Sequence, residues 1–150
     1  MATYDLQPEM SSVEVTKNLV SAITSRKYDL IVANYANPDM VGHTGNLQAA
    51  IDACASVDVG LGQVETALHA AGGAMIVCAD HGNCETMLDL ETGGPHTAHT
   101  INPVPVVLVG GPSSAKLRAG GRLADLAPSL LTLMEIDQPK EMTGKSLIEI

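Results

Sequence analysis

Paired histidine and carboxylate side chains are the residues of this sequence most suited to chemistry. Asp39 with His43 and Asp80 with His81 combine a carboxylate with a histidine, and His96 with His99 form a third pair of two histidines. Mixed carboxylate and imidazole donors suit Mn, Zn or Fe, and the absence of paired thiolates disfavours a structural zinc site. Any one pair could instead serve a turn or a cap. Three pairs together favour a metal site.

The pattern around these pairs predicts α/β architecture, with the first two pairs following buried strands. Apolar runs predict strands over Asp29–Tyr35, Ala74–Ala79 and Val104–Val109. Apolar residues at helical spacing predict helices over 12–26, 47–71 and 123–134, the first with a capping box from Ser11 to Glu14. Tyr4–Met10 is predicted to be extended, and Asn37–Gly45 a loop. Because ligands bind where strands end in open α/β sheets, Asp39 and Asp80 are expected at one sheet edge.

The position of His99 predicts the direction of the third strand. Only four residues separate His99 from Val104, and they reach about 14 Å at most, whereas the strand itself spans about 20 Å. If His99 joins Asp39 and His43, this strand must begin at the metal edge and run antiparallel to the other two. The long polar connection over 83–103, with a small hairpin near Thr86–Thr92, is the kind of loop that usually serves function.

Bulk properties narrow the function classes. The 150 residues carry a net charge of −9 and no cluster of Lys and Arg, which argues against nucleic-acid binding. No apolar run reaches the roughly 18 residues of a membrane span. Cys54, Cys78 and Cys84 lack metal-site spacing and are expected to be reduced in a cytoplasmic protein. The roles of Cys84 and His96 stay open.

Four blocks of the sequence, in order along nearly the whole chain, resemble the cofactor-independent phosphoglycerate mutases of the alkaline phosphatase superfamily. They are Tyr4–Ser11, Asn37–Gly45, Ala79–Glu85, and His96–Thr100 followed by Asn102–Pro105. Asp80-His81-Gly82 alone is shared across that superfamily, whereas the nine residues from Asn37 are specific. Ile101 stands where the family pattern has Thr. The resemblance implies an alkaline-phosphatase-like α/β sandwich, with a mixed, mostly parallel sheet flanked by helices.

The resemblance also implies a two-manganese site for phosphoryl transfer. Asp39, His43 and His99 match the ligands of one ion, and Asp80 and His81 match half of the other site. Mg²⁺, Zn²⁺ or Co²⁺ could replace Mn²⁺. In the family, a serine takes the phosphate of one phosphoglycerate, and glycerate then takes it back on its other hydroxyl. The substrate of the complete enzyme is thus phosphoglycerate, and the complete enzyme is expected to be monomeric.

By the same resemblance, residues 1–150 form the C-terminal part of the phosphatase-like metal-binding domain. We expect the nucleophilic serine and the phosphotransferase domain to be absent from this chain, which would then be inactive alone. Two alternatives remain at this point: another phosphomutase or phosphatase of the superfamily, and a non-catalytic metal-binding module. The blocks from Tyr4 and from Asn37 disfavour the first alternative.

Overall fold

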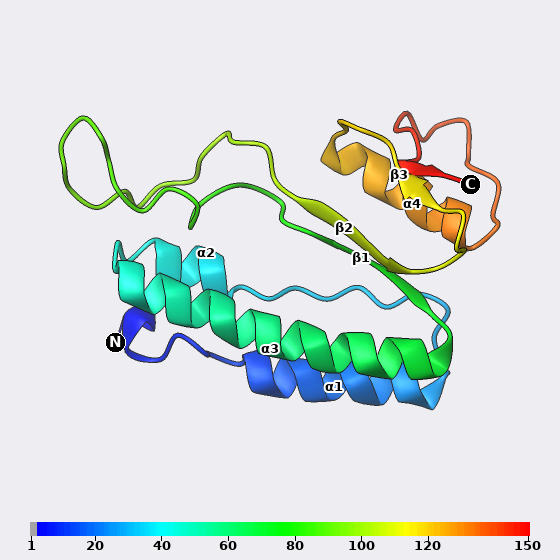
Figure 1. Ribbon diagram of the computed structural model, residues 1–150, viewed down its shortest axis with the longest axis horizontal. Coiled ribbons are helices and arrows are strands. Elements are labelled where there is room, and N and C mark those ends of the chain that lie inside the picture. The colour runs from blue at the N-terminus through cyan, green and yellow to red at the C-terminus, as the bar shows by residue number, and fades with distance from the viewer. Residues whose placement is uncertain (1–2) are drawn as a thin grey trace. The chain divides into compact units, whose positions relative to one another are not determined.

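The computed structural model describes residues 3–150, which divide into two compact units. The first unit contains the residues up to Ala71 together with His81–Val104, and the second contains Gly72–Asp80 and Pro105–Ile150. No helix of the described residues is long and apolar enough to cross a membrane. Figure 1 gives the elements that each unit contains.

The first unit is built on two helices, α1 (Ser12–Ser25) and α3 (Leu47–Ala71), which pack along each other (Figure 1). Small residues allow a close approach, because a Cβ at Gly60 would lie 2.6 Å from the Thr16 hydroxyl oxygen. That hydroxyl bonds to Tyr35 Oη at 2.7 Å, and Ser12 bonds to Ser56 at 2.7 Å. Polar pairs inside the interface therefore fix how the two helices align.

Helix α3 has the predicted bounds, and its two ends explain why. At its start the Asn46 side chain accepts a hydrogen bond from the Ala49 backbone N–H at 3.2 Å, which satisfies one of the free donors there. At its end Gly72 adopts φ +73°, the left-handed conformation typical of the residue that terminates a helix. The capping box predicted for α1 is wrong, since Ser11 makes no side-chain cap bond.

The segment Asn37–Gly42 is a helix, α2, and not the predicted loop. Pro38 lies in its first turn, where its fixed φ favours helix and no N–H is needed. The Asn37 amide donates to the carbonyls of Pro8 and Glu9 at 2.9 and 2.7 Å, which anchors the start of α2. Val41, fully buried, packs in a small core with Ala49, Ala53 and Met10. Helix α2 is thus anchored at its start and by one buried side chain although it is short.

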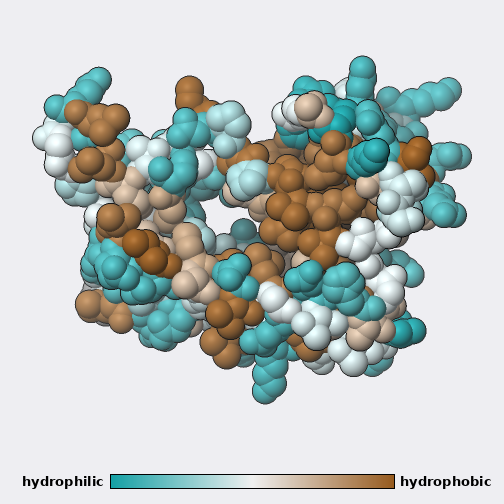
Figure 2. Space-filling model, in the orientation of Figure 1, coloured by the Kyte–Doolittle hydropathy of each residue, from teal (hydrophilic) through white to brown (hydrophobic). Residues whose placement is uncertain are grey.

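Two other predictions for the first unit are also wrong. Tyr4–Leu6 forms a 3₁₀ turn, η1, instead of an extended segment. Asp29–Tyr35 forms no strand, and Tyr28, Leu30 and Val32 expose half or more of their surface. A strand that is buried on both faces needs neighbouring strands, and no strand of the described residues pairs with this segment. The exposed apolar side chains of both units are visible as brown patches in Figure 2.

The second unit contains two two-stranded antiparallel sheets. Strand β1 (Ala74–Cys78) pairs with β2 (Val106–Gly110), so that Cys78 lies opposite Val106 and β2 begins where β1 ends. This confirms that the third strand runs antiparallel to the second, whereas its direction relative to Asp29–Tyr35 stays a prediction because that segment forms no strand. Strand β3 (Lys116–Leu117) pairs with β4 (Ile148–Glu149). Every strand pair of the described residues is antiparallel, so the predicted mostly parallel sheet is not formed here.

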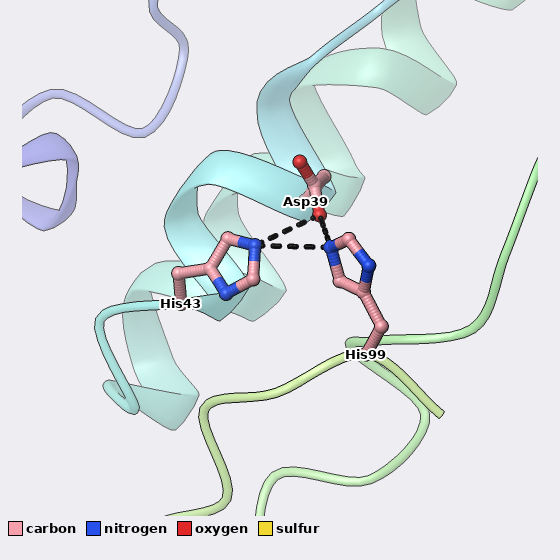
Figure 3. A group of neighbouring side chains, drawn as sticks. All are labelled: Asp39, His43 and His99. Atoms are coloured by element: carbon pink, nitrogen blue, oxygen red, sulfur yellow. Dashed lines mark hydrogen bonds and ion pairs between the residues drawn. The ribbon is translucent and has the colours of Figure 1, made fainter. Parts of the chain in front are cut away.

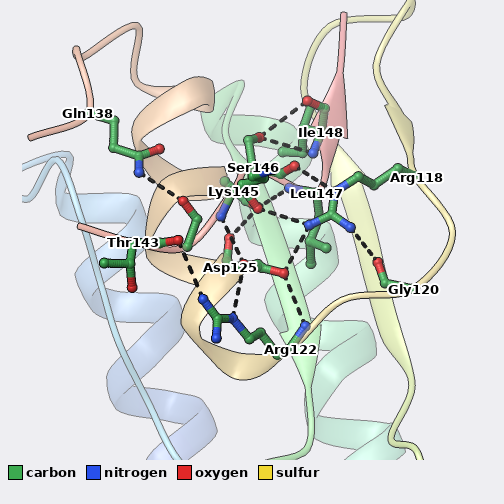
Figure 4. A network of polar contacts seen from close by, with 12 residues as sticks. Arg118, Gly120, Arg122, Asp125, Gln138, Thr143, Lys145, Ser146, Leu147 and Ile148 are labelled. Atoms are coloured by element: carbon green, nitrogen blue, oxygen red, sulfur yellow. Dashed lines mark hydrogen bonds and ion pairs between the residues drawn. The ribbon is translucent and has the colours of Figure 1, made fainter. Parts of the chain in front are cut away.

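The last predicted helix is divided into η2 (Leu123–Asp125) and α4 (Leu126–Leu133), and α4 packs on β1. Asp125 organises this part of the chain (Figure 4). Its carboxylate accepts hydrogen bonds from the backbone N–H groups of Lys145 and Arg122 at 2.8 and 3.1 Å, and from Arg118 at 2.9 Å. The N–H of Lys145, above all, lowers the pKa of Asp125. The network fastens the C-terminal residues to α4.

Candidate metal centre

Helix α2 presents Asp39 and His43 on the same face, because residues four apart in a helix lie one above the other. The His43 N–H bonds to the Asp39 carbonyl at 3.2 Å, so one helical turn separates the two side chains. His43 Nε2 lies 3.2 Å from Asp39 Oδ1. Asp39 also lies in the first turn of α2, where the helix dipole favours a negative charge.

His99 reaches the same point from the connection that follows His81. Its Nε2 lies 2.9 Å from Asp39 Oδ1 and 3.1 Å from His43 Nε2, and Figure 3 shows the three side chains converging. The predicted convergence of His99 with Asp39 and His43 is therefore observed. The three donor atoms lie within 4.8 Å of one another, from residues up to 60 positions apart in sequence.

The spacing of these atoms fits a divalent metal ion. Tetrahedral zinc with ligand distances of about 2.0–2.1 Å holds its ligand atoms about 3.3 Å apart. The observed separations of 2.9, 3.1 and 3.2 Å are close to that value. Two neutral imidazole nitrogens at 3.1 Å can share at most one proton between them, whereas a cation would satisfy both lone pairs and the carboxylate. The donor set therefore fits an ion.

Neighbouring groups orient two of the three donors. The Thr97 carbonyl lies 2.7 Å from His43 Nδ1, so Nδ1 carries the proton of a neutral ring and leaves the Nε2 lone pair facing the site. The Asn83 amide, which is buried, donates to Asp39 Oδ1 at 3.3 Å. Sequence reasoning missed both contacts. Thr97 acts through its backbone carbonyl, which any residue could supply, whereas Asn83 lies within the recognised Ala79–Glu85 block.

His81 lies beside this cluster. Its ring stacks on that of His99 with centroids 3.7 Å apart, and its Nε2 is 3.9 Å from Asp39 Oδ1. Asp80 precedes His81 directly but belongs to the second unit. Its role as a ligand, and that of His81, stay predictions.

Cys84 and His96 take no part in the three-residue cluster. The Cys84 thiol donates to the Pro38 carbonyl at 2.8 Å, and burial, followed by the neighbouring Cys54, raises its pKa to about 11. A thiol held protonated in this way is a poor competitor for a metal. His96 Nε2 is buried without a hydrogen-bond partner, and its backbone N–H bonds to Met87.

Comparison with known proteins settles the family. The profile of the metalloenzyme superfamily matches residues 1–138. This chain belongs to the metalloenzyme superfamily. The metalloenzyme chain is 70% identical over 149 residues to the 2,3-bisphosphoglycerate-independent phosphoglycerate mutase of Cereibacter sphaeroides. The aligned region covers 99% of this chain and 29% of the Cereibacter protein. It is 67% identical over 150 residues to the enzyme of the same name from Agrobacterium fabrum, again over 29% of that protein.

A solved structure gives the same relationship. The metalloenzyme chain matches Leishmania mexicana phosphoglycerate mutase, studied at low cobalt concentration, with a TM-score of 0.90 and 30% identity. The match covers 99% of this chain and 30% of that one. The resemblance found in the sequence is confirmed, and with it the α/β class of the alkaline phosphatase type. The chain spans less than a third of the length of the relatives it matches.

Proposed function

We propose that this chain is the C-terminal metal-binding portion of a cofactor-independent phosphoglycerate mutase. The observation that carries the proposal is the convergence of Asp39, His43 and His99, the residues that the family resemblance assigns to one metal ion. Identity of 67–70% to named mutases along almost the whole chain supports the same assignment. The complete enzyme interconverts 2- and 3-phosphoglycerate through phosphoserine, as a cytoplasmic, monomeric enzyme of glycolysis and gluconeogenesis.

In this proposal the 150 residues supply ligands, and the rest of the enzyme supplies the serine and the phosphotransferase domain. Asp39, His43 and His99 hold one manganese ion, and Asp80 and His81 contribute to a second. Bound divalent ions lower the pKa of a nucleophile and neutralise phosphoryl oxygens. Thr97 keeps His43 in the tautomer that binds metal, and Asn83 holds the Asp39 oxygen in place. The chain alone is expected to be inactive.

The proposal extends to the sheet. Asp29–Tyr35 exposes apolar side chains and has the composition of a buried strand. We expect it to become one when the remaining strands of the enzyme are present. A mixed, mostly parallel sheet flanked by helices would then form, with β2 as an antiparallel member.

Titration of the chain with Mn²⁺, and with Co²⁺ as a coloured substitute, tests the proposal by calorimetry and visible absorption. We expect about one tightly bound ion per chain at pH 7–8, and loss of binding below about pH 6 as protons compete for the imidazoles. His43→Ala should weaken binding at least tenfold. His69→Ala is the matched control, because His69 is an exposed histidine on α3 that pairs with Glu65. Two equally tight ions, or unchanged affinity in His43→Ala, would contradict the ligand assignment.

A further inference from the structure

Glu85 connects two loops that each carry histidines of the candidate metal centre. Its Oε2 accepts a hydrogen bond from the Asn83 backbone N–H at 2.6 Å. Its Oε1 accepts from the Thr100 hydroxyl and, at 2.9 Å, from the Asn102 amide. One carboxylate thus receives three donors from two segments that lie about 15 residues apart. Charge-assisted bonds of this kind are stronger than neutral ones.

The two segments also contact each other directly beside Glu85. The Thr100 N–H donates to the Gly82 carbonyl at 2.9 Å, in an isolated antiparallel bridge. Gly82 is buried, and a Cβ there would collide with both the Thr100 hydroxyl and the Glu85 carboxylate. At this crossing of the two segments, Gly82 thus leaves the space that the Thr100 hydroxyl and the Glu85 carboxylate occupy.

The residues next to the crossing face the metal centre. His81 precedes Gly82, and its ring stacks on His99, which precedes Thr100. The backbone N–H of Asn83 donates to Glu85, and the side-chain amide of Asn83 donates a hydrogen bond to Asp39. Hence Glu85 contacts Asn83, which itself touches the cluster, and Thr100 and Asn102, which lie one and three residues after His99. A carboxylate at this place can set the positions of His99 and of Asn83 together.

We infer that Glu85 is a positioning residue, which locks the His81–Asn83 and His99–Asn102 segments together and so fixes the geometry of the metal centre. The inference rests on the proposed metal site. Hydrogen bonding, first of all that from the Thr100 hydroxyl, lowers the pKa of Glu85 to about 2. At every pH at which imidazoles bind metal, the carboxylate is therefore ionised and acts solely as a hydrogen-bond acceptor. Glu85 acts through its neighbours, as outer partners of metal ligands commonly do.

Cobalt binding tests this role, with Glu85→Ala compared to wild type and to Glu91→Ala. Glu91 is an exposed glutamate of the same connection and serves as the matched control. We expect Glu85→Ala to weaken Co²⁺ binding roughly 10- to 100-fold, and to change the intensity of the visible Co²⁺ bands because the ligand geometry loosens. Glu91→Ala should leave both the affinity and the spectrum unchanged.

Thr100→Val is a second, milder variant, because valine has nearly the shape of threonine but lacks the hydroxyl that donates to Glu85. It allows the role of Glu85 to be tested if Glu85→Ala does not fold. It should weaken binding in the same direction, and the double variant should bind no worse than Glu85→Ala, because both act through one contact. Folded Glu85→Ala or Thr100→Val with wild-type affinity and spectrum would overturn the inference. Failure of wild type itself to bind Co²⁺, or unchanged binding in His43→Ala, would instead refute the proposed metal site, and the role of Glu85 would fall with it.

Discussion

Replacing Val41 by alanine tests whether the small core under α2 holds the metal ligands in place. Val41 lies between Asp39 and His43, and its side chain is fully buried against Ala49 and Ala53. The substitution removes two methyl groups, worth about 0.8 kcal/mol each in transfer free energy. The cavity adds to that loss, so we expect the free energy of unfolding to fall by about 2–3 kcal/mol.

Urea denaturation followed by far-UV circular dichroism measures this loss. Val59→Ala on α3 makes the same chemical change at a side chain that is 63% exposed, and should stay within about 0.5 kcal/mol of wild type. An ion at a hundred times its dissociation constant would add about 2.7 kcal/mol. Saturating Co²⁺ should therefore return Val41→Ala close to the stability of the metal-free wild type. Equal stability of the Val41→Ala and Val59→Ala chains would refute the reasoning.

Two further predictions concern other parts of the chain. Ser129 is fully buried, and its hydroxyl oxygen accepts a hydrogen bond from the Leu147 N–H at 2.7 Å. Ser129→Ala leaves that donor unsatisfied and should lower the free energy of unfolding by about 1–3 kcal/mol. Urea denaturation measures the loss, with Ser25→Ala as the exposed control. The second prediction is acid sensitivity. Because the pKa of Glu85 falls from 4.5 to about 2 on folding, mainly through the Thr100 hydroxyl, its contribution to stability is complete above about pH 5 and is lost as the pH falls towards 2. Denaturation midpoints of wild type and Glu85→Ala should converge over that range, and a gap that stays constant from pH 5 to pH 2 would contradict this.

Local sequence signals were sufficient for the elements whose stability is local. Helix α3 followed from its apolar spacing and from Gly72, which adopts the left-handed conformation that ends a helix. Helix α2 was missed although Pro38 is also a helix-start signal, because Asn, Pro and Asp are equally typical of turns. Asp29–Tyr35 was predicted as a strand from the same kind of apolar run as β1. A strand depends on its neighbours, which a local pattern does not reveal.

The candidate site was predictable where residue type carries the chemistry. Asp39, His43 and His99 were identified from their donor atoms and from the family pattern, and the short link from His99 to β2 gave the antiparallel direction of that strand. Thr97 contributes a carbonyl that any residue could supply, so its type gave no signal. Glu85 lay inside a recognised block, but its partners Thr100 and Asn102 are distant in sequence.

The meeting of His43 with His99, 56 positions apart, has a consequence for the stability of the chain. A single ion bound by both would cross-link the chain reversibly. A permanent cross-link over that length would restrict the unfolded chain by about 4 kcal/mol, whereas an ion that leaves on unfolding stabilises the folded state only as far as its concentration exceeds its dissociation constant. An ion at the proposed site would therefore act as a removable cross-link between α2 and the connection that carries His99. Metal supply would then govern how much of this part of the protein is folded.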